Sequence, residues 1–233
     1  MSSSHMKRLA MPRSWPLPRK TTVWVSRPRP CGHPLERCMP LGVVLRDVLG
    51  VASTSREAKR ALATRTILVD GQVTTDIRRG VGLMDVLTVG DLHYRCVLDK
   101  NGKLRYVSIP AKQAGEKLCR IDGKTTISGG QTQLNLHDGR NIIVDDANKY
   151  NSRDTIRIAV DSQKVKKHHK FKSGVLAYLI GGSHIGFTAE VTEYIEKRSS
   201  KDNEVLFAEF GTIADHVFVI GAAGDVPEAE VVE

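Results

Sequence analysis

The stretch that decides the fold is PLGVVLRDVLGVASTSREAKRALATRTILVDGQVTTDIRRGVGLMDVLTV, residues 40–89. Its first half predicts two short helices. Pro40 and Gly50 bound the first helix, because proline favours a helix start and glycine a helix end, and the apolar residues between them share one helical stripe. The second helix opens on a capping box, in which Thr54 is the N-cap and Glu57 follows three residues later.

The second predicted helix has an apolar face and a basic face. Helical spacing turns Ala58, Ala61 and Leu62 inward. The basic side chains on the other side, and one at the helix exit, are Arg56, Lys59, Arg60 and Arg65. The following TILVDGQVT places Asp-Gly between β-rich runs at 70–71, which predicts a hairpin turn. Residues 40–105 are therefore expected to form a helix–turn–helix–hairpin unit with a β extension, in which Asn-Gly at 101–102 closes another hairpin.

The composition indicates a polyanionic partner. The 233 residues carry a formal net charge of +9, with 40% hydrophobic and 5% aromatic residues, and the sequence pI is about 9.5. Nucleic acid is the usual partner of such a chain, and an anionic membrane surface is the alternative. No apolar run approaches the roughly 18 residues that span a bilayer, and no signal peptide is visible. We expect a cytoplasmic protein of one large or two to three small domains.

Residues 1–39 predict a basic, proline-rich arm that RNA orders. Six prolines prevent regular structure, and eight basic residues oppose one acid, so the segment is expected to be disordered when free. Trp15 and Trp24 are expected to be exposed, where they could stack on bases. The alternatives are a solvated tail, with Met1–His5 in part an expression remnant, and tryptophans that dock on the protein itself.

The rest of the chain predicts two small β units and a tail. Residues 106–173 contain short strands with Gly turns at 122–123 and 138–139, which is typical of a small barrel or sandwich, and they end on a Lys/His-rich run at 164–172. Residues 174–221 predict a second β unit in which Gly186 lies between a turn and a strand. Gly186 is expected to need φ > 0 or the absence of a Cβ. Residues 222–233 read as a disordered acidic tail.

The residues resemble known families at several points in one order. REAKRALATRTILVDGQVTTD looks like the alpha-L RNA-binding motif, and GVLAYLIGGSHIGFTAEVTEYI resembles the KOW motif of SH3-like barrels. KRLAMPRSWPLPRK, CMPLGVVLRDVLG and LVDGQVTTDIRRGVGLMDVLTV resemble the archaeal and eukaryotic small-subunit ribosomal protein four, e-type. The resemblance spans about residues 7–221, and the short acidic ending resembles the archaeal type. It implies an α+β, multidomain fold with an alpha-L unit, a central small β domain and a C-terminal SH3-like KOW barrel.

No catalytic or metal constellation stands out. The sequence lacks a phosphate-binding glycine loop and a nucleophile elbow. Alpha-L motifs also occur in pseudouridine synthases, but the G-R-L-D motif of those enzymes is absent, because Gly139-Arg140 continues into Asn-Ile. The four cysteines form no C-x-x-C pair; Cys31 and Cys38, with His33 between them, are spaced too widely for an ordinary zinc knuckle. We expect free thiols, no metal, no cofactor and no enzymatic activity.

The remaining function is RNA binding. The resemblance implies a structural constituent of the small ribosomal subunit, bound to its ribosomal RNA and neighbouring proteins, present once per ribosome and not a homo-oligomer. The alternative is an RNA-binding factor that acts off the ribosome in transcription elongation or as an RNA chaperone. Lysine and arginine supply phosphate contacts. The predicted RNA-binding residues are Lys7, Arg8, Arg13, Trp15, Arg19, Lys20, Arg27, Arg29, Arg56, Lys59, Arg60, Arg65, Lys166, Lys167, His168, His169, Lys170 and Lys172.

Overall fold

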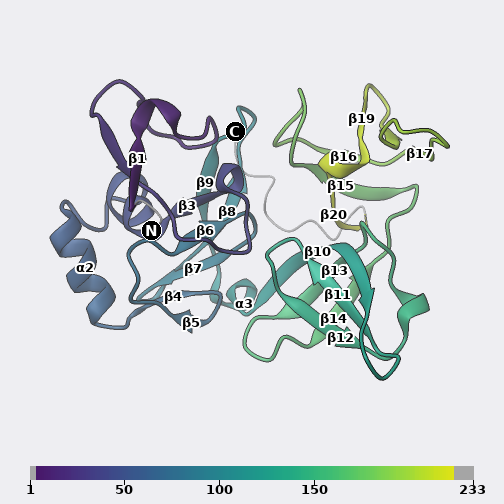
Figure 1. Cartoon of the computed structure of the whole chain (residues 1–233), viewed down its shortest axis with the longest axis horizontal. Coiled ribbons are helices and arrows are strands. Elements are labelled where there is room, and N and C mark those ends of the chain that lie inside the picture. Colours follow the sequence, from purple (N-terminus) through teal and green to yellow (C-terminus); the bar gives the residue numbers. More distant parts are fainter. Residues whose placement is uncertain (1–3, 223–233) are drawn as a thin grey trace. The chain divides into compact units, whose positions relative to one another are not determined.

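The computed structural model describes residues 4–222, drawn in colour in Figure 1. The chain divides into two compact units. The first comprises the residues up to 98 together with 103–117, and the second comprises 99–102 together with the residues from 118 onward. The expected boundary between 105 and 106 lies inside a strand, β9 (Leu104–Ile109). The predicted acidic tail, 222–233, lies outside the described residues except for Ala222, which ends the last strand.

The N-terminal segment of the first unit is folded, so the expectation of a disordered arm is wrong. Strands β1 (His5–Lys7) and β2 (Trp24–Ser26) pair antiparallel. A short 3₁₀ turn follows each of them in the chain: η1 (Arg8–Ala10) comes after β1, and η2 (Leu35–Arg37) comes after β2. The prolines prevent longer elements, but they do not prevent burial: Trp15, Met11 and Val25 are all in the core. The apolar area that the segment buries therefore offsets the conformational entropy lost on ordering. The proline-rich, basic composition of the segment does not indicate this burial.

Strand β3 (Cys38–Pro40) pairs with β6 (Gly80–Gly82). It ends at the predicted proline, and the helical part begins there. Helix α1 (Leu41–Val43) continues directly as one π-turn, η3 (Val44–Val48), and Gly50 ends it with φ +66°. Helix α2 (Ser55–Ala63) has the predicted capping box, because the Glu57 amide donates to Oγ1 of Thr54 and the Glu57 carboxylate accepts from the Thr54 amide. Both predicted helices are confirmed.

A five-stranded antiparallel sheet completes the first unit, in the order β5-β4-β7-β8-β9. Its other strands are β4 (Ile67–Val69), β5 (Gln72–Val73), β7 (Val86–Val89) and β8 (Leu92–Leu98). The predicted turn between β4 and β5 is present, with φ +49° at Asp70 and +70° at Gly71, as a tight hairpin turn requires. The predicted turn at Asn101-Gly102 also joins β8 to β9. A short helix, α3 (Ala111–Ala114), follows.

The second unit contains a five-stranded sheet in the order β12-β11-β10-β13-β14. The strands are β10 (Glu116–Thr126), β11 (Thr132–Leu136), β12 (Asn141–Val144), β13 (Thr155–Ala159) and β14 (Val165–His169), and a 3₁₀ turn, η4 (Ala147–Lys149), lies between β12 and β13. The predicted turn at Asp122-Gly123 is wrong. The pairing of β10 with β11 continues through it with only a register shift, and the reversal follows at residues 128–130.

Two three-stranded sheets, both in the second unit, form the C-terminal part, in the orders β16-β15-β20 and β17-β18-β19. The strands are β15 (Val175–Leu179), β16 (Thr188–Glu190), β17 (Glu193–Ile195), β18 (Glu204–Leu206), β19 (Gly211–Ile213) and β20 (Val217–Ala222), with a 3₁₀ turn, η5 (Ala214–His216), before β20. Their inward side chains form one core around Ala177, Leu179 and Val219. Gly186 has φ +82°, and a Cβ there would lie 2.3 Å from the carbonyl oxygen of Asp99. Both predicted requirements at Gly186 are confirmed.

Among residues 4–222, no helix is long and apolar enough to cross a bilayer. The longest helix, α2, has nine residues. The described part of the chain is thus a mixed structure of mostly strands and few helices in several sheets.

Candidate nucleic-acid interface

Helix α2 presents a basic face to solvent in the first unit. Ala58 and Leu62 are buried and Ala61 is half-buried, so the apolar stripe holds the helix against its own unit. The four predicted basic residues all lie on the exposed side: Arg56, Lys59, Arg60 and Arg65. Arg65 has φ +59°, a left-handed conformation that costs free energy in a non-glycine residue and is concentrated at functional sites.

The basic residues of the N-terminal segment divide into exposed and occupied side chains. The exposed ones are Lys7, Arg13, Lys20, Arg27 and Arg29. Arg29 forms an ion pair with Asp76 at 3.0 Å, and Arg19 is half-buried with a hydrogen bond to the Leu9 carbonyl. Arg8 is buried, where its guanidinium donates to the Pro18 carbonyl and to Thr22. Arg8 therefore stabilises the segment itself.

The expectation of an exposed Trp15 is wrong. The side chain has no exposed surface, and its indole Nε1 donates to the Cys38 carbonyl at 2.9 Å. Trp24 is the tryptophan that remains accessible, at 55% exposure, with the His5 ring against it edge to face. A base could stack on Trp24, whereas Trp15 anchors the segment to β3.

The middle of the Lys/His-rich run, Val165–His169, forms β14, an edge strand of the second unit. The exposed residues of the run are Lys164 and the four predicted lysines, Lys166, Lys167, Lys170 and Lys172. Neither of the two predicted histidines is exposed: His168 Nε2 lies 2.7 Å from a carboxylate oxygen of Asp154, and His169 is buried. Burial, with positive neighbours such as Lys167, lowers the pKa of His169 to about 4. Lysines on an edge strand also discourage pairing with another sheet, so these lysines have a structural explanation beside the RNA-binding one.

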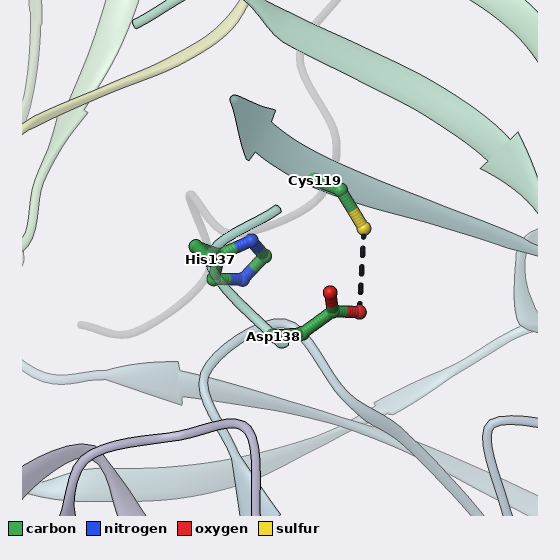
Figure 2. Close-up of side chains that lie close together, drawn as sticks. All are labelled: Cys119, His137 and Asp138. Atoms are coloured by element: carbon green, nitrogen blue, oxygen red, sulfur yellow. Dashed lines mark hydrogen bonds between the residues drawn. The ribbon is translucent and has the colours of Figure 1, made fainter. Parts of the chain in front are cut away.

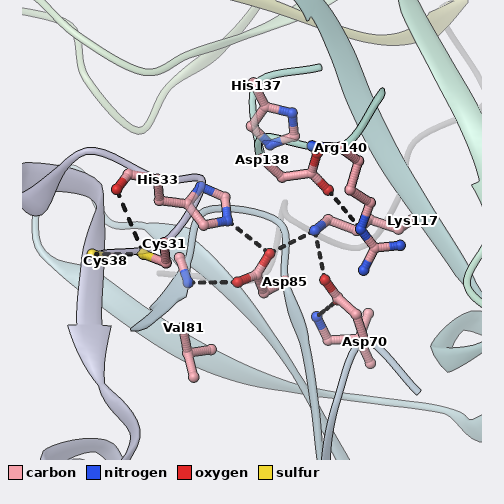
Figure 3. A network of polar contacts seen from close by, with 12 residues as sticks. Cys31, His33, Cys38, Asp70, Val81, Asp85, Lys117, His137, Asp138 and Arg140 are labelled. Atoms are coloured by element: carbon pink, nitrogen blue, oxygen red, sulfur yellow. Dashed lines mark hydrogen bonds and ion pairs between the residues drawn. The ribbon is translucent and has the colours of Figure 1, made fainter. Parts of the chain in front are cut away.

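A buried ionic network, which the sequence analysis did not identify, lies within the first unit (Figure 3). The Lys117 ammonium group lies 2.6 Å from Oδ1 of Asp85 and 2.8 Å from Oδ2 of Asp70. His33 Nε2 is 2.9 Å from the same Asp85 oxygen, and the Gly82 amide donates to the other oxygen. Gly82 must lack a side chain, because a Cβ there would lie 2.4 Å from the His33 ring.

Two carboxylates within this network have pKa values shifted in opposite directions. Burial raises the pKa of Asp70, and the negative charge of Asp85 adds to that effect. Burial alone would also raise the pKa of Asp85, but the positive charge of Lys117 and the contact with His33 outweigh it and hold the pKa below the ordinary range. The network holds the N-terminal segment and residue 117 against the β6–β7 region, so its role in this chain is structural.

One group of potential metal ligands occurs among the described residues. Figure 2 shows Cys119, His137 and Asp138, whose ligand atoms lie within 4.8 Å of one another. His137 Nδ1 accepts a hydrogen bond from the Arg120 amide at 3.2 Å, and Arg140 lies 3.3 Å from the Asp138 carboxylate. These contacts engage one ring nitrogen and place a positive charge beside the carboxylate, so the arrangement is better explained as a turn that orders β11 and β12.

Two family models match this chain. The RS4NT (NUC023) domain covers residues 2–36, and Ribosomal family S4e covers residues 90–165. Both models point to one class of protein, a ribosomal protein family. The folded N-terminal segment thus corresponds to a recognised domain.

Whole-chain relatives agree with the models. The small ribosomal subunit protein eS4 of Methanocaldococcus jannaschii is 41% identical over 231 residues, covering 93% of each chain, and that of Ignicoccus hospitalis is 38% identical over 232 residues, covering 93% of this chain and 91% of the relative. The crystal structure of the 30S ribosomal protein S4e from Thermoplasma acidophilum has a TM-score of 0.72 at 33% identity, covering 81% of this chain and 97% of that one. The chain belongs to Ribosomal family S4e.

Proposed function

We propose that this protein is a non-catalytic structural constituent of the small ribosomal subunit, where it binds and stabilises folded small-subunit ribosomal RNA. The observation that carries the proposal is α2, whose inward side holds Ala58 and Leu62 while its outward side exposes a cluster of basic side chains. Membership of Ribosomal family S4e identifies the small subunit as the place of action. The protein therefore acts in the cytoplasm.

Three separate basic surfaces support binding to a large folded RNA. They are the N-terminal segment and α2 in the first unit and the edge strand β14 in the second. Lysine and arginine contacts to phosphates give affinity without sequence information. Weak contacts in one chain gain avidity when one partner presents all the sites together. Ribosomal RNA can do so, and we propose one copy per subunit beside neighbouring ribosomal proteins.

The alpha-L unit and the C-terminal KOW barrel are proposed as the modules that carry these contacts. In the first unit, the turn at Arg65 immediately precedes β4, and the tight hairpin turn at Asp70-Gly71 immediately follows it. This arrangement would allow a helix and a turn to contact one RNA surface. In the second unit, the two C-terminal sheets share a small hydrophobic core around Ala177.

An RNA-binding factor acting off the ribosome is the second candidate, favoured by the small β unit at 174–221. Co-sedimentation separates the two functions. The full chain, expressed with a tag in an archaeal host, should remain with the small subunit through a high-salt wash, whereas a factor should be released. A variant with Arg56, Lys59 and Arg60 changed to Glu should lose the association, and Lys201→Glu, on an exposed loop of the second unit, should retain it. Release of the parent protein at high salt would reject the ribosomal function.

A further inference from the structure

Two thiols of the N-terminal segment face each other within the first unit. Cys31 Sγ lies 3.8 Å from Cys38 Sγ (Figure 3). Cys31 is exposed, whereas Cys38 is 1% exposed at the start of β3. One thiol can therefore meet a small oxidant from solvent, while its partner is held in place by the strand.

The neighbouring strand leaves room for this pair. A Cβ at Gly80, on β6, would lie 2.5 Å from Cys31 Sγ and 3.5 Å from Cys38 Sγ. Real Cβ atoms do not approach so closely, so a glycine at residue 80 is needed for the thiols to occupy this position. The φ of Gly80 is not in the left-handed region, and the requirement is one of space alone.

The two thiols differ in acidity. The hydrogen bond from Cys38, more than the contacts with His33, lowers the pKa of Cys31 to about 6 despite partial burial and the charge of Asp85. The same hydrogen bond, together with burial and the charges of Asp85 and Cys96, raises the pKa of Cys38. The accessible sulfur is thus the nucleophile, and the buried sulfur keeps its proton.

We propose that Cys31 and Cys38 form a peroxide-reactive dithiol that closes to an intramolecular disulfide. The geometry also identifies the order of events, since only Cys31 is reachable from solvent. Oxidation would link the loop before η2 to the first residue of β3, and a thiol reductant would reverse it.

The chemistry balances with one peroxide as the oxidant. The Cys31 thiolate attacks the peroxide, so that an S–O bond forms, the O–O bond breaks and the leaving oxygen takes a proton as water or an alcohol. The Cys38 sulfur then attacks the sulfenic sulfur of Cys31, forming the S–S bond and breaking the S–O bond. The departing hydroxide takes the Cys38 proton and leaves as water. Two thiols are oxidised and one peroxide is reduced.

The test uses the reduced, full-length protein and hydrogen peroxide. Peptide mapping under non-reducing conditions should find a Cys31–Cys38 disulfide, while the buried Cys96 and Cys119 of the same molecules remain thiols. The rate of alkylation of Cys31 by iodoacetamide should reach half its maximum near pH 6. A free cysteine, whose pKa is about 8.5, would reach it near that pH. Cys38→Ser should stop the reaction at a Cys31 sulfenic acid, which dimedone traps.

Further variants keep the outcome decisive if Cys38→Ser misfolds. The exposed Cys31→Ser should abolish the disulfide and leave Cys38 unreactive. Gly80→Ala should slow disulfide closure at least several-fold, whereas Gly115→Ala, with no atom within 4 Å of its added Cβ, should not. Intermolecular disulfides, oxidation of all four cysteines at similar rates, or a Cys31 alkylation midpoint near pH 8.5 would each overturn the proposal.

Discussion

The ammonium group of Lys117 lies 2.6 Å from a carboxylate oxygen of Asp85, and the Lys117 side chain is entirely shielded from solvent. A buried charge pair of this kind contributes little relative to an apolar pair of the same shape, but it is costly to break. Lys117→Met leaves two buried carboxylates without their cation. It is expected to lower the free energy of unfolding by about 3–5 kcal/mol, measured by urea denaturation at pH 7. Lys112→Met, on the exposed side of α3, is the matched control and should change little.

Acid should reduce the defect of Lys117→Met. The pKa of Asp85 in the parent is lowered, so its contribution to stability is present at neutral pH and is lost as the pH falls through the folded-state pKa. Without Lys117, only His33 and the Gly82 amide still oppose burial at Asp85, so the pKa of both carboxyl groups should rise and protonation at mild acidity should remove buried charge. The difference in unfolding free energy between parent and variant should therefore shrink between pH 7 and pH 5. An equal difference at both values would contradict the electrostatic explanation.

The two tryptophans should behave oppositely. Trp15 is fully buried and donates a hydrogen bond to Cys38, whereas Trp24 is 55% exposed. Trp15→Ala should cost about 3–5 kcal/mol of stability, and Trp24→Ala should stay within about 0.5 kcal/mol. Thermal melts give the stabilities, and filter binding to small-subunit ribosomal RNA gives the affinities. Only Trp24→Ala is expected to weaken binding at unchanged stability.

Gly186 should tolerate no side chain. Its φ of +82° disfavours other residues, and an added Cβ would meet backbone atoms of Asp99, which cannot rotate away. Gly186→Ala is expected to cost more than the roughly 1–3 kcal/mol of conformational strain alone. Gly182→Ala shares the positive φ, at +83°, but its nearest atom is 3.3 Å away on the His216 side chain. In thermal melts of the full chains, Gly186→Ala should melt at a lower temperature than Gly182→Ala, because only Gly186→Ala places a Cβ against the Asp99 backbone. Equal melting temperatures would rule out that steric clash.

Arg60 should contribute to RNA binding and not to folding. It is exposed on α2, so Arg60→Ala should remove about one phosphate contact. The slope of log affinity against log salt concentration should then fall by about 0.7–0.9, while stability stays within about 0.5 kcal/mol. Lys201→Ala, in the loop before β18, should leave the slope unchanged. Loss of stability without a change in slope would place the RNA contact on another face.

His169 should make the protein sensitive to mild acid. Burial lowers its pKa from 6.5 to about 4 in the folded protein, so between these values the unfolded chain binds more protons than the folded one. Stability attributable to this residue is therefore complete above pH 6.5 and declines as the pH falls toward 4. His169→Gln should lose less stability than the parent between pH 7 and pH 5, measured by denaturant titration. His5→Gln, at an exposed position, should follow the parent.

Local signals in the sequence were sufficient where the decisive contacts are also local. The capping box at Thr54 and the turn at Asp70-Gly71 involve residues within four positions of each other. The dipeptide Asp122-Gly123 carries the same local signal and forms no turn. Gly123 instead pairs with Asn135 on the neighbouring strand β11, and that partner is distant in sequence. A hairpin signal therefore depends on whether the flanking residues pair with each other or with another strand.

The basic surface was predictable by position along a helix, but the buried polar residues were not. The periodicity around Ala58 and Leu62 places the α2 basic residues outside without any tertiary information. Trp15 and His33 lie in a proline-rich, basic segment whose composition indicates disorder. Their burial depends on the Cys38 carbonyl and on Asp85, the latter 52 residues from His33. No periodicity connects such pairs.

The position of Asp85 between His33 and Lys117 also constrains the order of events during translation. The two partners of this carboxylate are 84 residues apart in the chain, from 33 to 117. At about 5–20 residues per second, the ribosome needs about 4–17 s to synthesise that interval. Asp85 follows His33 by 52 residues, and for the remaining 32 residues the nascent N-terminal segment can contact Asp85 only without the cation that completes the network. Native docking of the segment therefore finishes late, after most of the first unit has emerged.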